Sequence, residues 1–113
     1  GGRTGSNFHA EAVKDAVERL DAAGVLSRLI VDCSHANSAK DYSKQCVAWN
    51  DVIDQRASGS KSIVGLMVES NLRPGNQKPA KPTELEYGVS ITDGCIGWDE
   101  TEQLIRDAHR KLS

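Results

Sequence analysis

The chain alternates between stretches of helical spacing and two short, unbroken apolar runs. In the first stretch, apolar residues recur every three or four positions, which predicts an amphipathic helix over about residues 8–23. Ser6 or Asn7 is expected to cap its N-terminus, and Gly24 is expected to end it. The predicted inner face consists of Val13, Val17, Leu20 and Gly24.

The two apolar runs, residues 28–32 and 63–68, have the composition of buried strands. Such β-branched runs are typical of strands that are covered on both faces in parallel sheets. A second helical pattern over about residues 39–57 lies between them, with Ser38 and Asp41 as a capping pair. Strand, helix and strand then form a right-handed βαβ unit. The expected apolar stripe of this helix is Tyr42, Cys46, Trp49 and Ile53.

The remainder of the chain has no clear period until its last helix. Residues 70–97 contain all three prolines and predict no regular element, and loops of this length are usually functional or mobile. Asp99 predicts the N-cap of the last helix, with Glu102 as its capping-box partner. The predicted class is α/β, with too few strands for a free-standing parallel sheet. The stripe of the last helix is Leu104, Ile105, Ala108 and Leu112.

Length and composition exclude several classes of protein to which the chain could belong. With 113 residues the chain holds one domain at most, which excludes a two-domain enzyme. Fourteen basic against 16 acidic residues disfavour a nucleic-acid partner, and the longest uncharged apolar run, 63–68, is far shorter than the ~20 residues of a membrane span. One Phe, two Tyr and two Trp are few for a self-sufficient core. The composition therefore indicates a piece of something larger.

The first residues and the cysteines add two expectations. The chain starts with Gly1 rather than Met and has no signal-like segment, so we expect that residues have been removed before it or that a cloning remnant stands there. The three cysteines, Cys33, Cys46 and Cys95, cannot all pair and show no CxxC spacing. This usage is typical of a reduced, cytoplasmic protein.

Candidate chemistry gathers where the predicted strands end. His35 follows the first strand and Glu69 the second, and ligands of parallel α/β folds bind outside the carboxyl ends of strands. Asp93, in the long loop, is a third candidate. One imidazole and two carboxylates suit a divalent Mn, Fe, Co or Zn ion. A single loop hydrogen bond is the simpler interpretation of His35, and Asp32 has either an orienting, a basic or a structural role.

Three strings occur in order: IVDCSHANS at 30–38, GLMVESNL at 65–72, and YGVSITDGCIGW at 87–98. Together they closely resemble the C-terminal part of type I 3-deoxy-D-arabino-heptulosonate 7-phosphate (DAHP) synthase, in the branch that responds to aromatic amino acids. The similarity runs over essentially the whole chain. Cys33 stands where many relatives have an aromatic residue.

The resemblance implies a (β/α)8 barrel enzyme. It condenses phosphoenolpyruvate with erythrose 4-phosphate, releases phosphate and begins the shikimate pathway to aromatic amino acids. The family binds a divalent metal through a Cys, a His, a Glu and an Asp, and the last three fall on His35, Glu69 and Asp93. His35 would also act as a catalytic residue that positions substrate or water, and Asp93 would contact erythrose 4-phosphate.

The resemblance also implies what is not in residues 1–113. The metal-binding Cys and most phosphate-binding Lys and Arg residues belong to preceding parts of the family, whose barrel needs roughly 250 residues. We therefore expect residues 1–113 to be the C-terminal sector of a single (β/α)8 barrel, inactive alone and homo-oligomeric in the parent enzyme. The alternatives are a non-catalytic, self-associating α/β fragment and another divalent-metal-dependent aldolase, in which Cys95 would replace the missing ligand.

Overall fold

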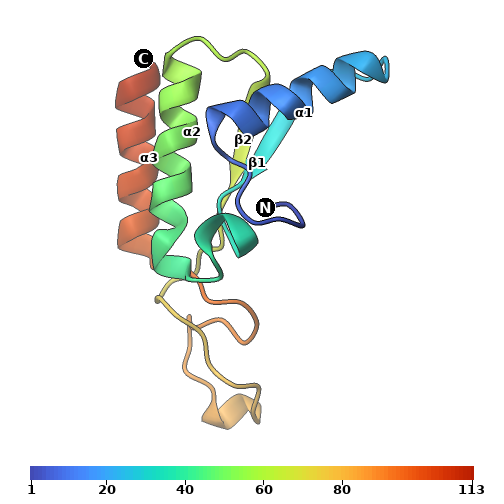
Figure 1. Ribbon diagram of the computed structural model, residues 1–113. Coiled ribbons are helices and arrows are strands. Elements are labelled where there is room, and N and C mark those ends of the chain that lie inside the picture. The colour runs from blue at the N-terminus through green and yellow to red at the C-terminus, as the bar shows by residue number, and fades with distance from the viewer.

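Two parallel strands, β1 (Leu29–Asp32) and β2 (Ile63–Met67), lie at the centre of the structure. In this computed structural model, which describes residues 1–113, helix α2 (Gln45–Ala57) connects them. Helix α1 (Ala10–Ala22) precedes the strands, and α3 (Trp98–Leu112) ends the chain. Figure 1 shows α2 and α3 side by side, with the loop between β2 and α3 extending away from the helices as a long arm. The predicted α/β order is confirmed.

The strand register decides which residues leave the sheet at the same edge. Leu29 pairs with Ile63 and, after an irregularity, Asp32 pairs with Met67. The amide of Cys33 extends the ladder by donating to the carbonyl of Met67 at 2.8 Å. Because the strands are parallel, the segments that follow Asp32 and Met67 begin next to one another.

One face of this sheet is covered and the other is open. Helices α1 and α2 bury the first face, and the core cluster there is Phe8, Val13, Val31, Cys33, Ala48, Val52 and Ile63. On the opposite face, Ile30 is 72% exposed and Val64 is 52% exposed. The prediction that both faces are covered is therefore wrong within these residues, because no element of the chain packs over Ile30 and Val64.

The start of α1 differs from the capping prediction. Its N-cap is His9, which makes no side-chain cap bond, so neither Ser6 nor Asn7 caps the helix. The backbone amide of Asn7 instead donates to Oδ1 of Asn37 at 2.7 Å. A contact across 30 residues thus replaces the local cap. At the other end, Gly24 has φ +66° and closes a Schellman motif, as predicted.

Helix α2 begins six residues later than predicted. Two single-turn 3₁₀ helices, η1 (His35–Ser38) and η2 (Tyr42–Lys44), occupy the preceding segment. Asp41 caps η2 by accepting from the amide of Ser43 at 3.1 Å, so the predicted Ser38–Asp41 pair does not form. The late start also rotates the buried face. Its members are Gln45, Ala48, Val52 and Ile53, of which only Ile53 was predicted.

The last helix and the loop before it also depart from prediction. Gly97 is the N-cap of α3, Asp99 lies in the first helical turn, and no capping box with Glu102 forms. The loop 70–97 contains a short 3₁₀ helix, η3 (Pro82–Glu84). Its two halves are joined by isolated backbone bridges, so the arm is a paired structure. These bridges are Ser70–Ile96, Gly75–Cys95 and Asn76–Ser90.

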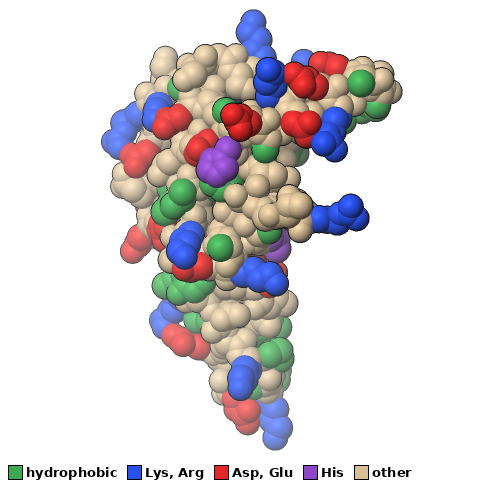
Figure 2. Space-filling view, in the orientation of Figure 1, with side chains coloured by type: hydrophobic (Ala, Val, Ile, Leu, Met, Phe, Trp, Pro, Cys, Tyr) green, Lys and Arg blue, Asp and Glu red, His purple; other side chains and the backbone are tan.

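Two further features concern the helices and the surface charge. None of the helices combines the length and apolar character that a membrane crossing requires. Figure 2 shows acidic and basic side chains interspersed over the visible face, as expected for a net charge of −2.

Candidate metal centre

His35 lies directly beyond β1 in an unusual backbone conformation. Its φ is +53°, the left-handed region that a side chain with a Cβ rarely adopts. Asp32 holds the segment at two points, since Oδ1 accepts from the amide of Ser34 at 2.8 Å and Oδ2 lies 2.8 Å from Nδ1 of His35. A carboxylate is only an acceptor, so Nδ1 carries the proton in this bond. The interaction leaves Nε2 as the nitrogen available for another partner.

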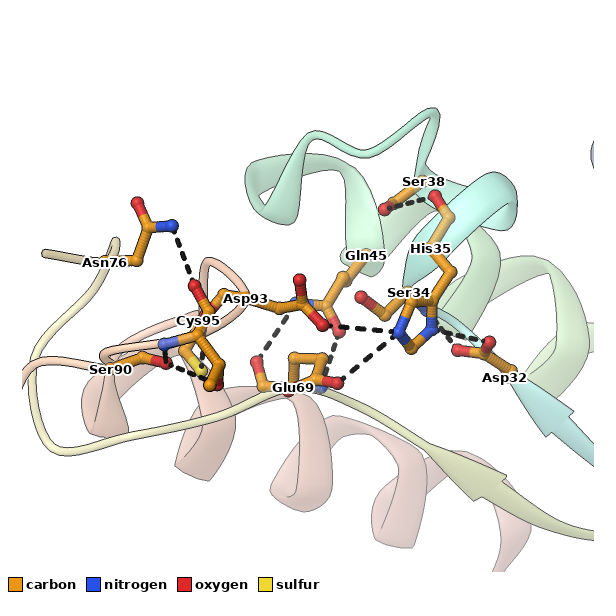
Figure 3. A network of polar contacts seen from close by, with 11 residues as sticks. Asp32, Ser34, His35, Ser38, Gln45, Glu69, Asn76, Ser90, Asp93 and Cys95 are labelled. Carbon is orange, nitrogen blue, oxygen red and sulfur yellow. Dashed lines mark hydrogen bonds and ion pairs between the residues drawn. The ribbon is translucent and has the colours of Figure 1, made fainter. Parts of the chain in front are cut away.

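The free side of the imidazole faces two carboxylates. Nε2 of His35 lies 3.7 Å from Oε1 of Glu69 and 3.6 Å from Oδ2 of Asp93. One ligand atom from each of the three residues lies within 4.8 Å of the other two. Figure 3 shows the three side chains converging from η1, from the segment after β2 and from the arm. Ligands bound at about 2.1 Å from one ion lie about 3–4 Å apart, so the two distances from Nε2 of His35 fit a shared cation.

The surrounding charge acts on the imidazole. The pKa of His35 is raised, first by the hydrogen bond to Asp32 and then by the charge of Asp32. Desolvation lowers this pKa, and the charges of Glu69 and Asp93 raise it by smaller amounts. Three carboxylates around one imidazole thus make this edge of the sheet strongly attractive to a cation.

Glu69 is held through its backbone. Its amide donates to Oε1 of Gln45 at 2.7 Å, and its carbonyl accepts from Nε2 of Gln45 at 3.0 Å. The same carbonyl accepts from the amide of Ile96 at 2.9 Å. Asp93, whose side chain is 68% exposed, stands on a turn that Ser90 and Asn76 hold. Oγ of Ser90 accepts from the amide of Thr92 at 3.1 Å, and Nδ2 of Asn76 donates to the carbonyl of Thr92 at 2.9 Å.

The three predicted ligands therefore come together. Comparison with known proteins identifies the family of the chain. The DAHP synthetase I family matches residues 1–106. The chain belongs to this family. The predicted resemblance to DAHP synthase is confirmed.

Individual relatives agree with the family match. The chain is 44% identical over 108 residues to a Tyr-sensitive phospho-2-dehydro-3-deoxyheptonate aldolase of Salmonella typhimurium, covering 95% of this chain and 30% of the relative. It is 46% identical over 100 residues to a Phe-sensitive one of Escherichia coli K12, covering 88% and 29%. The solved phospho-2-dehydro-3-deoxyheptonate aldolase of Francisella tularensis superposes with a TM-score of 0.90 at 40% identity, over 99% of this chain and 32% of that one. The chain thus spans about 30% of the length of these two curated relatives.

A small cavity of about 230 Å³ opens beside two of the candidate ligands of this DAHP synthetase I family member, His35 and Asp93. A larger hollow of about 600 Å³ lies between α1 and α2, away from the carboxylate–imidazole cluster. Only the smaller of these two cavities is lined by candidate ligands. Its lining residues are Ser34, His35, Ser38, Lys40, Tyr42, Asp93 and Gly94.

Sequence reasoning missed one residue of the site and left two roles open. Gln45 was missed, because no local pattern connects a helical glutamine to a backbone 24 residues away. Asp32 has the orienting contact that was one of its possible roles. Cys95 is buried, burial raises the pKa of its thiol, and its Sγ lies 3.6 Å from the carbonyl of Asp93. It is not part of the ligand cluster.

Proposed function

We propose that residues 1–113 supply the metal-binding part of a DAHP synthase, the enzyme that joins phosphoenolpyruvate to erythrose 4-phosphate and releases phosphate in the first step of the shikimate pathway. The observation that carries the proposal is the convergence of His35, Glu69 and Asp93 within 4.8 Å at the carboxyl ends of both strands. Family membership and 44% identity to a named aldolase support it. The activity is that of the whole enzyme, since the chain spans about 30% of its relatives.

The ligand set selects the ion and the roles of the residues. Nε2 of His35 and the carboxylates of Glu69 and Asp93 would bind a divalent Mn, Fe, Co or Zn ion. Such an ion, when bound, acts as a Lewis acid on the aldehyde oxygen of erythrose 4-phosphate. Asp32 keeps the proton on Nδ1 and so presents the lone pair of Nε2. Asp93 lies on the wall of the 230 Å³ cavity and would also contact the chain of erythrose 4-phosphate.

The same proposal covers the architecture. Residues 1–113 would form the C-terminal sector of one (β/α)8 barrel in a cytoplasmic homo-oligomer. Support comes from the TM-score of 0.90 over 99% of this chain and 32% of the solved relative's chain. The open face at Ile30 and Val64 is a second support, because barrel strands carry side chains on both faces. Residues 1–113 alone would be inactive, since the family's other phosphate-binding side chains lie outside them.

Metal titration tests the site directly. Co²⁺ added to the chain should give a visible absorption band whose intensity saturates, and His35→Ala, Glu69→Gln and Asp93→Asn should each weaken binding. His109→Ala, which removes an exposed histidine on α3, is the matched control and should bind like the parent. A parent chain that binds no Co²⁺, or ligand variants that bind as tightly as the control, would refute the metal site.

Two further measurements separate the alternatives. An assay of the chain with both substrates and Mn²⁺ should show no turnover, and measurable product would refute the predicted inactivity. The open face at Ile30 and Val64 also favours self-association of the chain. Light scattering should report species larger than a 12.2 kDa monomer. A monomer that unfolds cooperatively would contradict this expectation.

A further inference from the structure

We infer that Gln45 is a positioning residue for Glu69, and that it acts by clamping the backbone of this candidate ligand; the inference rests on the proposed metal-binding function. Gln45 is the first residue of α2, and its side chain is completely buried. Its planar amide makes both of its bonds to one residue. Oε1 accepts from the amide of Glu69 at 2.7 Å, and Nε2 donates to the carbonyl of Glu69 at 3.0 Å (Figure 3).

The Gln45 amide takes the place that a neighbouring strand would have beside the backbone of Glu69. β2 ends at Met67, so Glu69 lies beyond the parallel ladder, where its backbone groups still need partners. A side-chain amide offers the same donor and acceptor pair that a neighbouring strand would offer. The amide of Ile96 adds a third bond, to the Glu69 carbonyl at 2.9 Å. The peptide groups of Glu69 are therefore held from α2 and from the end of the arm.

Two bonds from one rigid amide control direction as well as position. They fix the plane of the Glu69 backbone and hence the direction in which its side chain leaves the chain. That direction brings Oε1 of Glu69 to 3.7 Å from Nε2 of His35. Because α2 carries Gln45 and packs on the core through Ala48 and Val52, the clamp is anchored on a rigid element.

Burial of a side-chain amide costs more free energy of desolvation than burial of an apolar side chain. An unpaired amide in an apolar site is unfavourable, and an apolar side chain of similar volume would pack without that penalty. Both amide atoms of Gln45 are paired, and no buried polar side-chain atom of the chain lacks a partner. The pairing defines the orientation of one residue, and that residue is a candidate ligand.

The test replaces the amide with an unbranched apolar side chain. In Gln45→Met, Co²⁺ affinity should fall by about 10- to 100-fold, as for other residues that support metal ligands, and the visible Co²⁺ spectrum should change. Gln55→Met is the matched control on the same helix. Its amide donates to the carbonyl of Phe8 at 2.8 Å, far from the cluster, so stability should fall while the Co²⁺ affinity and spectrum stay unchanged.

The outcomes separate the inference from the function on which it rests. If the parent chain binds no Co²⁺, the proposed function fails and the inference fails with it. If the parent binds but Gln45→Met binds as tightly, or Gln55→Met weakens binding equally, the inference alone is overturned.

A measurement without substitution covers the case in which Gln45→Met does not fold. In the parent chain, the Glu69 amide should exchange its hydrogen slowly and exchange more slowly still when Zn²⁺ is added. The amide of Leu72, an exposed residue that bonds to the side chain of Asn71 at 2.8 Å, should exchange faster and respond less to Zn²⁺. Equal exchange at the two amides, or no Zn²⁺ effect at Glu69, would overturn the clamp.

Discussion

The carboxylate of Asp32 lies 2.8 Å from Nδ1 of His35, on the side of the ring opposite to Glu69 and Asp93. A single contact thus selects which nitrogen faces the candidate metal position. Asp32 also stabilises the left-handed backbone conformation of His35, because its carboxylate simultaneously accepts from the amide of the preceding residue, Ser34. Carboxylate–histidine–metal arrangements of this kind fix the tautomer and orientation of the ligand.

Replacement of this carboxylate should weaken metal binding. Asp32→Asn should reduce Co²⁺ affinity by about 10- to 100-fold, because the neutral amide no longer holds Nδ1–H as strongly. Asp51→Asn is the matched control, since Asp51 pairs with His9 at 3.3 Å outside the site. Its Co²⁺ affinity should equal that of the parent. Equal affinity in Asp32→Asn and the parent would show that the ring is oriented by something else.

The pH dependence of the site follows from the raised pKa of His35. In the metal-free chain, the imidazolium–Asp32 pair stabilises the fold fully below the ordinary histidine pKa of about 6.5, and this contribution is lost as pH rises through the higher folded pKa. Metal needs the deprotonated ring, so its binding should weaken as pH falls through the same raised value. NMR titration of the ring should give a pKa above 6.5 that falls in Asp32→Asn. A value at or below 6.5 in the parent would contradict the geometry.

The turn that carries Asp93 should tolerate no side chain at Gly94. A Cβ there would lie 2.6 Å from Cδ1 of Tyr42, so the ring or the turn must move. We expect Gly94→Ala to weaken Co²⁺ binding because it displaces the neighbouring carboxylate. The double variant Tyr42→Ala/Gly94→Ala lacks the ring that the new Cβ would meet, so it should regain part of the Co²⁺ affinity. Unchanged binding in the single variant would mean that the turn adapts without moving Asp93.

The three thiols should differ in reactivity. Burial and the charge of Asp32 raise the pKa of Cys33 to about 12, and burial raises that of Cys95. Cys46 is only half-buried. At pH 8, a thiol reagent should therefore modify Cys46 first, and Cys46→Ser should abolish the fast phase. Fast labelling that persists in Cys46→Ser would contradict the burial of the other two.

Truncation of two isoleucines on the paired strands should change the free energy of unfolding by very different amounts. Ile63 is 2% exposed and Ile30 is 72% exposed. Ile63→Ala should lower the free energy of unfolding by about 2–5 kcal/mol, while Ile30→Ala should change it by about 0.5 kcal/mol. Urea unfolding measures both. A comparable loss for Ile30→Ala would indicate that its face is covered in solution, as self-association would do.

Much of the architecture is local in origin and was therefore predictable. Helical spacing around Val13 and the β-branched runs around Val31 and Val64 predict the order of elements without reference to distant residues. The parallel βαβ rule then brings His35 and Glu69 to one edge. The boundaries were less predictable, because Ser6, Asn7 and Asp99 are good capping residues that the structure does not use as caps.

The sequence by itself determined the class of fold, the order of its elements and the three candidate ligands, because periodicity and residue type act over a few positions. Only the tertiary structure decided how the ligands are aimed. Gln45 reaches Glu69 across 24 residues, and Asp93 arrives from a paired arm. It also decided that one sheet face stays open. These outcomes depend on which segments meet in space, and no local pattern contains that information.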